Sequence, residues 1–111
     1  MRGVRLKDMK GLVAALLLLG SAHVLAADHV VVLKKKVFSP ESISVKVGDS
    51  VEFRNDDPVE HAVASQSEAK SFDFDPLPPG ESRKVTFDKP GTVEVGCSMH
   101  DGMHLTILVA K

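Results

Sequence analysis

The chain has 111 residues, of which 43% are hydrophobic and 26% are charged, and its formal net charge is −1. This composition is typical of one ordinary globular domain, and it excludes a disordered chain, a large multidomain enzyme and a strongly basic nucleic-acid-binding protein. The single cysteine, Cys97, excludes an intramolecular disulfide framework and a zinc site built from several thiolates.

The N-terminal residues have the layout of a secretory signal peptide. An uncharged and largely apolar stretch, residues 11–27, ends in small residues and follows four basic ones, Arg2, Arg5, Lys7 and Lys10. A cut after Ala26 places Val24 and Ala26 at the two positions that require small side chains. An uncleaved membrane anchor is the alternative, but the stretch is at the short limit of the roughly 17–25 residues that a spanning helix needs. We therefore expect a signal peptide over residues 1–26 and an exported domain, periplasmic or equivalent, over residues 27–111.

Within this domain the apolar residues alternate with polar ones, which predicts half-buried strands and no helix longer than one turn. Turn signals such as Gly48-Asp49 and Pro78-Pro79-Gly80 separate the apolar segments at regular intervals. This pattern is typical of an all-β fold, an antiparallel sandwich or small barrel. The expected strands are residues 29–33, 43–47, 51–53, 61–65, 85–87, 93–97 and 105–109.

A possible metal site lies near the C-terminus, where Cys97, His100 and Met103 follow one another at Cys-x2-His-x2-Met spacing. Gly102 allows the segment between two strands to turn tightly, so that the three side chains converge on one ion. Copper(I) favours thiolate and thioether, whereas copper(II) accepts imidazole and thiolate, so a mixed set suits both oxidation states. A trigonal site needs a second imidazole. His61 is the only histidine in the middle of the exported domain, and we assign it as the fourth ligand.

Each of these residues also has a simpler interpretation. A lone cysteine at an inward strand position is usually an inert small hydrophobe, and Met103 could fill a gap in the core. The assignment of His61 depends on its position more than on its neighbours. His104 is an exposed histidine that is close enough in sequence to compete with Met103, and Met99 is a surface or partner contact. The combined spacing nevertheless favours a copper site.

At these residues the chain resembles the cupredoxins, the blue copper proteins that include plastocyanin, pseudoazurin and amicyanin. The segment from Asn55 to His61, the turn Pro79-Gly80-Glu81-Ser82, and Pro90-Gly91-Thr92 before the ligand loop occur in the family's order. The short gap between His100 and Met103 is similar to that of amicyanin. The resemblance implies a Greek-key sandwich of about seven or eight strands, one type 1 copper ion, and reversible one-electron transfer outside the cytoplasm.

The chain departs from the family at two positions beside the ligands. Ala62 follows the first histidine ligand, where the family usually has an asparagine whose side chain ties the two ligand loops together. Asp101 follows the second histidine, where proline is common. We expect the Asp101 carboxylate to favour copper(II) and lower the reduction potential, although solvent screens an exposed charge.

The resemblance implies a transient partner protein on each side of the electron transfer, docking near the edge of His100. By position, an apolar patch there would consist of Pro58, Val59, Met99, Gly102 and Met103. The acidic residues Asp56, Asp57, Glu60 and Asp101 are either a solvated loop face or a negative rim that steers a basic partner. We expect a monomer that neither binds nucleic acid nor stays inserted in a membrane after signal cleavage.

Two other functions use related chemistry. A copper carrier or storage protein would use the same soft ligands, and the cluster of Met99, Met103 and His104 is compatible with it. A copper enzyme, such as a multicopper oxidase or nitrite reductase, needs further copper clusters with a His-x-His motif, which the sequence lacks. We therefore predict an electron carrier, with a copper carrier as the alternative, and no enzyme activity.

Overall fold

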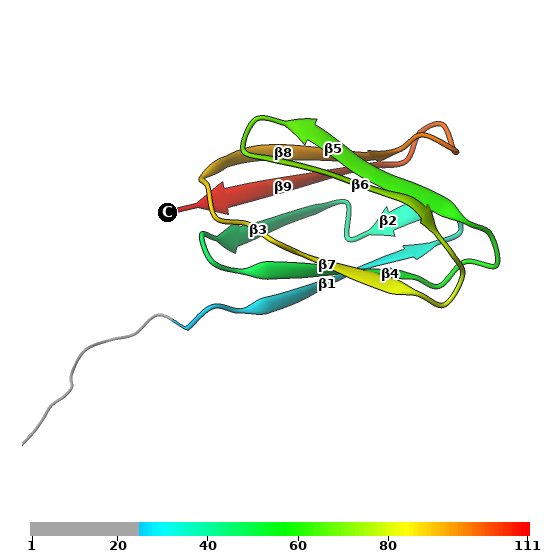
Figure 1. The fold of residues 1–111 in the computed structure, drawn as a ribbon, viewed down its shortest axis with the longest axis horizontal. Coiled ribbons are helices and arrows are strands. Elements are labelled where there is room, and N and C mark those ends of the chain that lie inside the picture. The colour runs from blue at the N-terminus through cyan, green and yellow to red at the C-terminus, as the bar shows by residue number, and fades with distance from the viewer. Residues whose placement is uncertain (1–24) are drawn as a thin grey trace, which may run out of the picture.

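The computed structural model describes residues 25–111, and the predicted signal peptide lies outside this part apart from its last two residues. In the described part the chain forms nine strands and no helix (Figure 1). No helix in residues 25–111 is long and apolar enough to cross a membrane. The strands are β1 (Asp28–Lys34), β2 (Val37–Ser39), β3 (Ser42–Lys46), β4 (Ser50–Asn55), β5 (His61–Ser67), β6 (Lys70–Leu77), β7 (Ser82–Thr86), β8 (Gly91–Cys97) and β9 (His104–Ala110).

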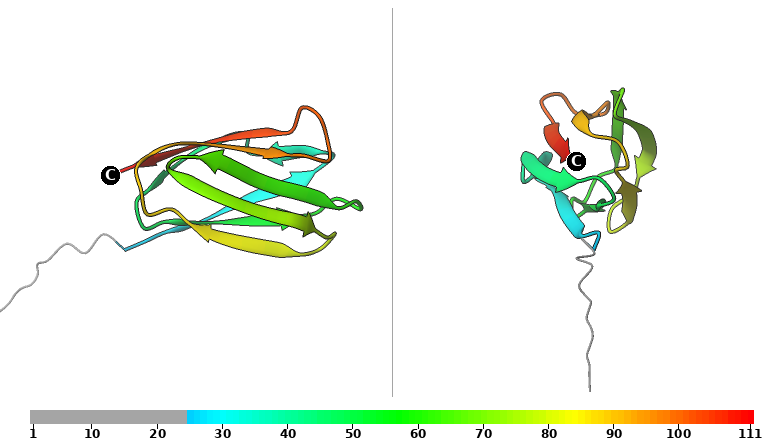
Figure 2. Two further views of the ribbon diagram at one scale, coloured as in Figure 1. Left: turned by 45° about the horizontal axis from the view of Figure 1, so that its top comes forward. Right: turned by 90° about the vertical axis from the view of Figure 1, so that its left-hand side faces the viewer.

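The strands form two sheets that pack face to face, as the end-on view of Figure 2 shows. One sheet has the strand order β2-β1-β4-β7, and the other has the order β3-β9-β8-β5-β6. The prediction of an all-β sandwich is therefore confirmed. Both sheets are mixed, however, because β1 runs parallel to β4 and β3 runs parallel to β9. Pairing between strands distant in sequence is invisible in the local alternation that predicted the strands, which is why the expected purely antiparallel order was wrong.

All seven expected strands are present, and β2 and β6 are additional. Strand β2 is only three residues long and pairs with β1 through a two-residue turn, Lys35-Lys36. Strand β6 places Phe72 and Phe74 toward the core, but aspartates and Pro76 stand among them. A proline and several charged residues are unusual inside a strand, so the sequence pattern of this edge strand was weak.

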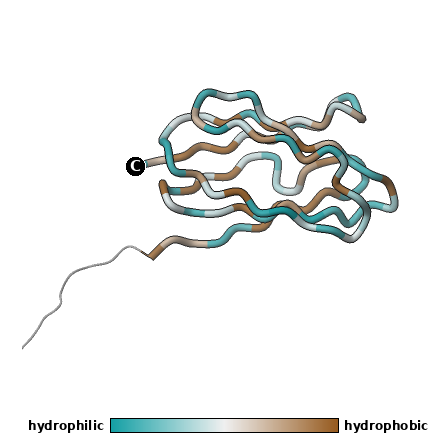
Figure 3. The backbone as a smooth tube through the Cα atoms, in the orientation of Figure 1, coloured by the Kyte–Doolittle hydropathy of each residue, from teal (hydrophilic) through white to brown (hydrophobic). Residues whose placement is uncertain are grey.

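The core lies between the sheets and consists of the inward residues of both. Hydrophobic and hydrophilic residues alternate along the strands (Figure 3). Phe53 of β4 meets Phe72 and Phe74 of β6, with ring centroids 5.6 and 6.4 Å apart. These distances are typical of favourable aromatic contacts, which add to the free energy gained by burying the rings. The contact joins the two sheets across the sandwich.

Asp49 ties the start of the described chain to the turn between β3 and β4. Its Oδ1 accepts the backbone N–H of Ala27 at 2.8 Å, and its Oδ2 lies 2.9 Å from the Lys46 nitrogen and 3.0 Å from Nε2 of His29. The hydrogen bond from Ala27, followed by those from His29 and Lys46, lowers the pKa of Asp49 to about 2. The carboxylate is thus bound in its ionised form.

This arrangement predicts a specific loss of stability in acid. A carboxyl group whose pKa is lower in the folded than in the unfolded chain stabilises the fold at pH values above its unfolded pKa, which is near 4. This contribution disappears as the pH falls toward the folded pKa of about 2. We expect Asp49→Asn to melt below the wild type at pH 7 and at nearly the same temperature at pH 2. Thermal unfolding of the two metal-free proteins across this range measures the difference. A constant gap at every pH would contradict the prediction.

Candidate metal centre

Three of the four predicted ligands meet at one end of the sandwich. His61 is the first residue of β5 and is fully buried, Cys97 is the last residue of β8, and half-buried His100 lies in the turn that follows. Strands β5 and β8 are neighbours, with Val63 opposite Cys97. Their pairing brings together two side chains that are 36 residues apart in sequence.

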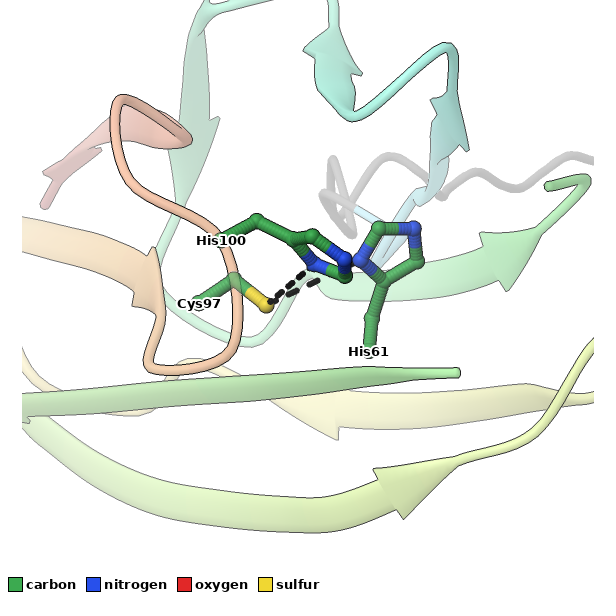
Figure 4. A group of neighbouring side chains, drawn as sticks. All are labelled: His61, Cys97 and His100. Atoms are coloured by element: carbon green, nitrogen blue, oxygen red, sulfur yellow. Dashed lines mark hydrogen bonds between the residues drawn. The ribbon is translucent and has the colours of Figure 1, made fainter. Parts of the chain in front are cut away.

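The donor atoms of these residues point toward one another (Figure 4). The Cys97 sulfur lies 3.7 Å from Nδ1 of His61 and 3.6 Å from Nδ1 of His100. The two imidazole rings meet at an angle of 62°, with centroids 4.7 Å apart. One sulfur and two ring nitrogens therefore face a common centre, all within 4.8 Å of one another.

These separations fit a single ion. A metal in the centre of a trigonal plane, with bonds of about 2.0–2.3 Å, separates its donor atoms by roughly 3.5–4 Å. Both sulfur–nitrogen distances fall in this range. Two imidazoles and one thiolate in a trigonal arrangement are the equatorial ligands of a type 1 copper site.

Met103 lies in the same loop, immediately before β9, and is 5% exposed. Gly102 precedes it with a φ of 84°, a left-handed conformation that glycine adopts without steric cost, as the tight turn required. The burial of Met103 agrees with both interpretations of this residue, as an axial ligand and as a core side chain. Met103 stays the predicted axial ligand.

The remaining histidines of the described chain lie elsewhere. Nε2 of His104 is 2.9 Å from Oε1 of Glu94, on the exposed face of β9 and β8, and His29 contacts Asp49. Neither belongs to the group of converging donors. His104 therefore pairs with a carboxylate instead of competing with Met103 at this site.

The two ligand segments are joined by the backbone at Ala62, where the family usually has an asparagine. The Ala62 N–H donates to the Cys97 sulfur at 3.3 Å, and the Ser98 N–H donates to the Ala62 carbonyl at 3.3 Å. The side-chain tie expected from the family is absent. Two main-chain contacts of the same residue nevertheless connect the segments that carry His61 and Cys97.

Asp57 is the residue that sequence reasoning placed wrongly. The sequence predicts an exposed position for it, in a solvated loop face or a negative rim, but it is only 6% exposed, and its Oδ2 lies 2.8 Å from Nε2 of His61. Its two oxygens also accept the backbone N–H groups of Lys35 and Lys36. Asp56, Glu60 and Asp101 are exposed, as expected. Lys35 and Lys36 are exposed too, and their backbone contacts Asp57, so the charge next to Asp56 is mixed.

Burial has the largest single effect on the Asp57 pKa and raises it, but the hydrogen bonds from Lys36, His61 and Lys35 together lower the pKa below its usual value. Three N–H donors thus outweigh the cost of removing the carboxylate from water. A weak signal was present in the sequence, since Asp57 precedes His61 by four residues. The burial of Asp57 depends on the Lys35-Lys36 turn, and no pattern in the sequence around Asp57 predicts its contact with that distant turn.

Asn55 holds the loop that carries Asp57. It is fully buried, and its amide nitrogen donates to the carbonyls of Val59 and Leu77, each at 2.9 Å. Its Oδ1 accepts the Asp57 N–H at 2.9 Å. The side chain thus fixes both ends of the segment between β4 and β5, in addition to the end of β6.

We therefore expect Asn55→Ala to destabilise the fold by about 3 kcal/mol, because it leaves buried backbone groups without hydrogen-bond partners. Urea unfolding of the metal-free protein measures this change. The matched control is Asp56→Ala, which removes the neighbouring, exposed side chain and should change the free energy of unfolding by less than about 0.5 kcal/mol. Equal effects of the two substitutions would contradict the role given to Asn55.

Comparison with known proteins gives consistent matches. The family model described as a cupredoxin-like domain matches residues 10–109. A purple cupredoxin from Nitrosopumilus maritimus superposes with a TM-score of 0.66 at 23% identity, over 74% of this chain and 99% of that one. An amicyanin variant in its copper(I) state gives a TM-score of 0.67 at 23% identity, over 73% and 80%. A copper-containing nitrite reductase from Thermus scotoductus gives 0.71 at 25% identity, over 86% of this chain but only 25% of the reductase.

Proposed function

The chain belongs to the cupredoxin-like family, and from this premise we propose that it is a small exported blue-copper protein that carries single electrons between partner proteins. His61, Cys97 and His100 would be the equatorial ligands, and Met103 the axial one. Copper, when bound, supplies the one-electron chemistry by alternating between its two oxidation states.

The observation that carries this proposal is the convergence of one sulfur and two Nδ1 atoms on a common centre. Two of the three residues belong to paired strands of the sandwich. Ligands held by the frame in this way move little when the charge of the metal changes. A small rearrangement favours fast electron transfer, because little energy is needed to adapt the surroundings.

His100 is the ligand best placed to connect the site with the surface. It is half-buried, whereas His61 is fully enclosed. Val59 and Met99, two members of the predicted apolar patch, are 37% and 46% exposed. We propose that redox partners dock there briefly, with the small contact area typical of such encounters, and that the protein works as a monomer.

A copper carrier is the alternative with the same ligands. Exposed Met99 beside the ligand loop is compatible with it. The buried His61, held by a carboxylate on its far nitrogen, supports electron transfer instead, because release of the ion would require this end of the sandwich to open. Reversible bleaching by a reductant supports an electron carrier. Transfer of the ion to a chelating acceptor under mild conditions supports a copper carrier.

We also propose that the chain is not itself an enzyme, although a nitrite reductase is among the similar structures. The match covers a quarter of the reductase chain. In the described part, the group of His61, Cys97 and His100 is the one set of converging metal donors. A pocket of about 240 Å³ lies between the β5–β6 and β7–β8 turns, at the end of β5 and β8 that is opposite to the metal donors. His61, Cys97 and His100 do not line it.

Export with removal of residues 1–26 is part of the proposal. The backbone nitrogen of Ala27 lies 2.8 Å from Oδ1 of Asp49. A cut after Ala26 would turn this nitrogen into an ammonium group facing a carboxylate, which is a favourable charge pair. We expect the mass of the periplasmic protein to correspond to a chain that begins at Ala27. A mass that includes the leader would contradict this part of the proposal.

The central test is the absorption and electron paramagnetic resonance spectrum of the exported protein after addition of a cupric salt. We expect an intense visible band from thiolate-to-copper(II) charge transfer that a reductant bleaches reversibly. Cys97→Ala should abolish the band. Met103→Ala should keep a coloured site with a changed reduction potential, because the axial ligand tunes the potential.

Met99→Ala is the matched control, since it removes an exposed methionine from the same loop. Its spectrum and potential should equal those of the wild type. A band that persists in Cys97→Ala would overturn the ligand assignment. Equal potentials in Met103→Ala and Met99→Ala would overturn the axial role of Met103.

A further inference from the structure

The far side of the His61 ring is held by a buried carboxylate. Nε2 of His61 lies 2.8 Å from Oδ2 of Asp57, and the exposed fractions of the two side chains are 0% and 5%. Because a carboxylate only accepts hydrogen bonds, the proton of a neutral His61 ring lies on Nε2. Nδ1 is then unprotonated, and it is the nitrogen that faces the Cys97 sulfur at 3.7 Å.

The carboxylate is itself fixed by another part of the chain. Lys35 and Lys36 form the turn between β1 and β2, and both have positive φ angles, 56° and 58°. Their consecutive N–H groups point at the two oxygens of Asp57. A pair of backbone N–H groups in this conformation makes a small concave site for an anion. Lysine is an unusual residue in such a turn, where Asn-Gly is preferred, so the carboxylate offsets an unfavourable backbone conformation.

We propose that Asp57 is a positioning residue for the metal centre: it fixes His61 in the tautomer whose Nδ1 accepts a metal, and its buried negative charge favours the cupric over the cuprous ion. This inference deepens the proposed function and rests on it for the redox effect. The tautomer of His61 is a property of the metal-free protein and does not rest on it.

The chemistry of metal sites gives the expected size of the effect. A hydrogen bond from a ligating histidine to a carboxylate orients the ring and raises its basicity, and loss of such a partner typically reduces metal affinity by 10–100-fold. In an Asp57→Asn variant, an amide NH₂ in the place of Oδ2 would face both Nε2 of His61 and the Lys36 N–H, and in the place of Oδ1 it would face the Lys35 N–H. The first orientation favours the proton on Nδ1, where it blocks the metal, and both orientations remove the negative charge and leave a turn N–H without its acceptor.

The first experiment records the two-bond ¹H–¹⁵N spectrum of the full exported chain without metal. We expect the His61 ring to carry its proton on Nε2 in the wild type and to lose this preference in Asp57→Asn. A wild-type ring protonated on Nδ1 would overturn the proposal. The wild-type spectrum tests the tautomer even if the variant does not fold.

The second experiment measures copper affinity and reduction potential in Asp57→Asn and in a matched control, Asp56→Asn. The control removes the same charge from an exposed position one residue earlier. We expect Asp57→Asn to bind copper(II) 10–100-fold more weakly than the wild type. We also expect its reduction potential to be higher than that of the wild type, by 59 mV for each factor of ten by which the loss of copper(II) affinity exceeds the loss of copper(I) affinity. The control should change both properties much less.

Equal shifts in the two variants would overturn the role of the buried charge. A wild type that gives no blue band, yet has His61 protonated on Nε2, would contradict the proposed function and leave only the effect of Asp57 on the His61 tautomer supported. The two failures are therefore distinguishable.

Discussion

The site depends on the antiparallel pairing of β5 with β8. This pairing places Val63 opposite Cys97, and the contacts of Ala62 with Cys97 and Ser98 extend it beyond the last paired residues. Strand pairing fixes distances to within a fraction of an ångström over several residues, because each main-chain hydrogen bond constrains the next. The positions of His61 and the cysteine sulfur thus follow from the sheet itself. The turn after Cys97 needs only to bring His100 back to the same point.

Local spacing in the sequence was sufficient to bring Cys97 and His100 together and insufficient for their surroundings. Cys97, His100 and Met103 lie within seven residues, so their spacing alone predicts that they converge, and the convergence of Met103 stays a prediction. Alternating apolar residues likewise predict strands, because a half-buried strand requires this period. Strand β6 was missed because Asp73, Asp75 and Pro76 interrupt its pattern. The parallel pairs were missed because the pattern of one strand carries no information about its neighbours.

Asp57 illustrates the same limit at a single residue. An aspartate in a polar segment next to a proline is normally solvated, and the local sequence gives no reason to bury it. Its burial requires three N–H donors, of which two come from Lys35 and Lys36, more than twenty residues upstream. Those donors are available because the turn has an uncommon backbone conformation. The position of this carboxylate is therefore a property of the folded chain, in which the turn between β1 and β2 supplies N–H donors to a carboxylate of the β4–β5 loop.

The two carboxylates next to the ligands also differ in how strongly they act on a metal. Asp101 lies in the ligand loop but is exposed, whereas Asp57 is enclosed. Two unit charges 4 Å apart interact by about 1 kcal/mol in water and by about 4 kcal/mol at the effective dielectric constant near a protein surface. The enclosed charge of Asp57 is therefore less screened than the exposed charge of Asp101, although Asp101 is the closer of the two to a predicted ligand in the sequence. The departure from the family at Asp101 is the more visible one in the sequence, but at the proposed copper centre the enclosed charge of Asp57 would act more strongly than the exposed charge of Asp101.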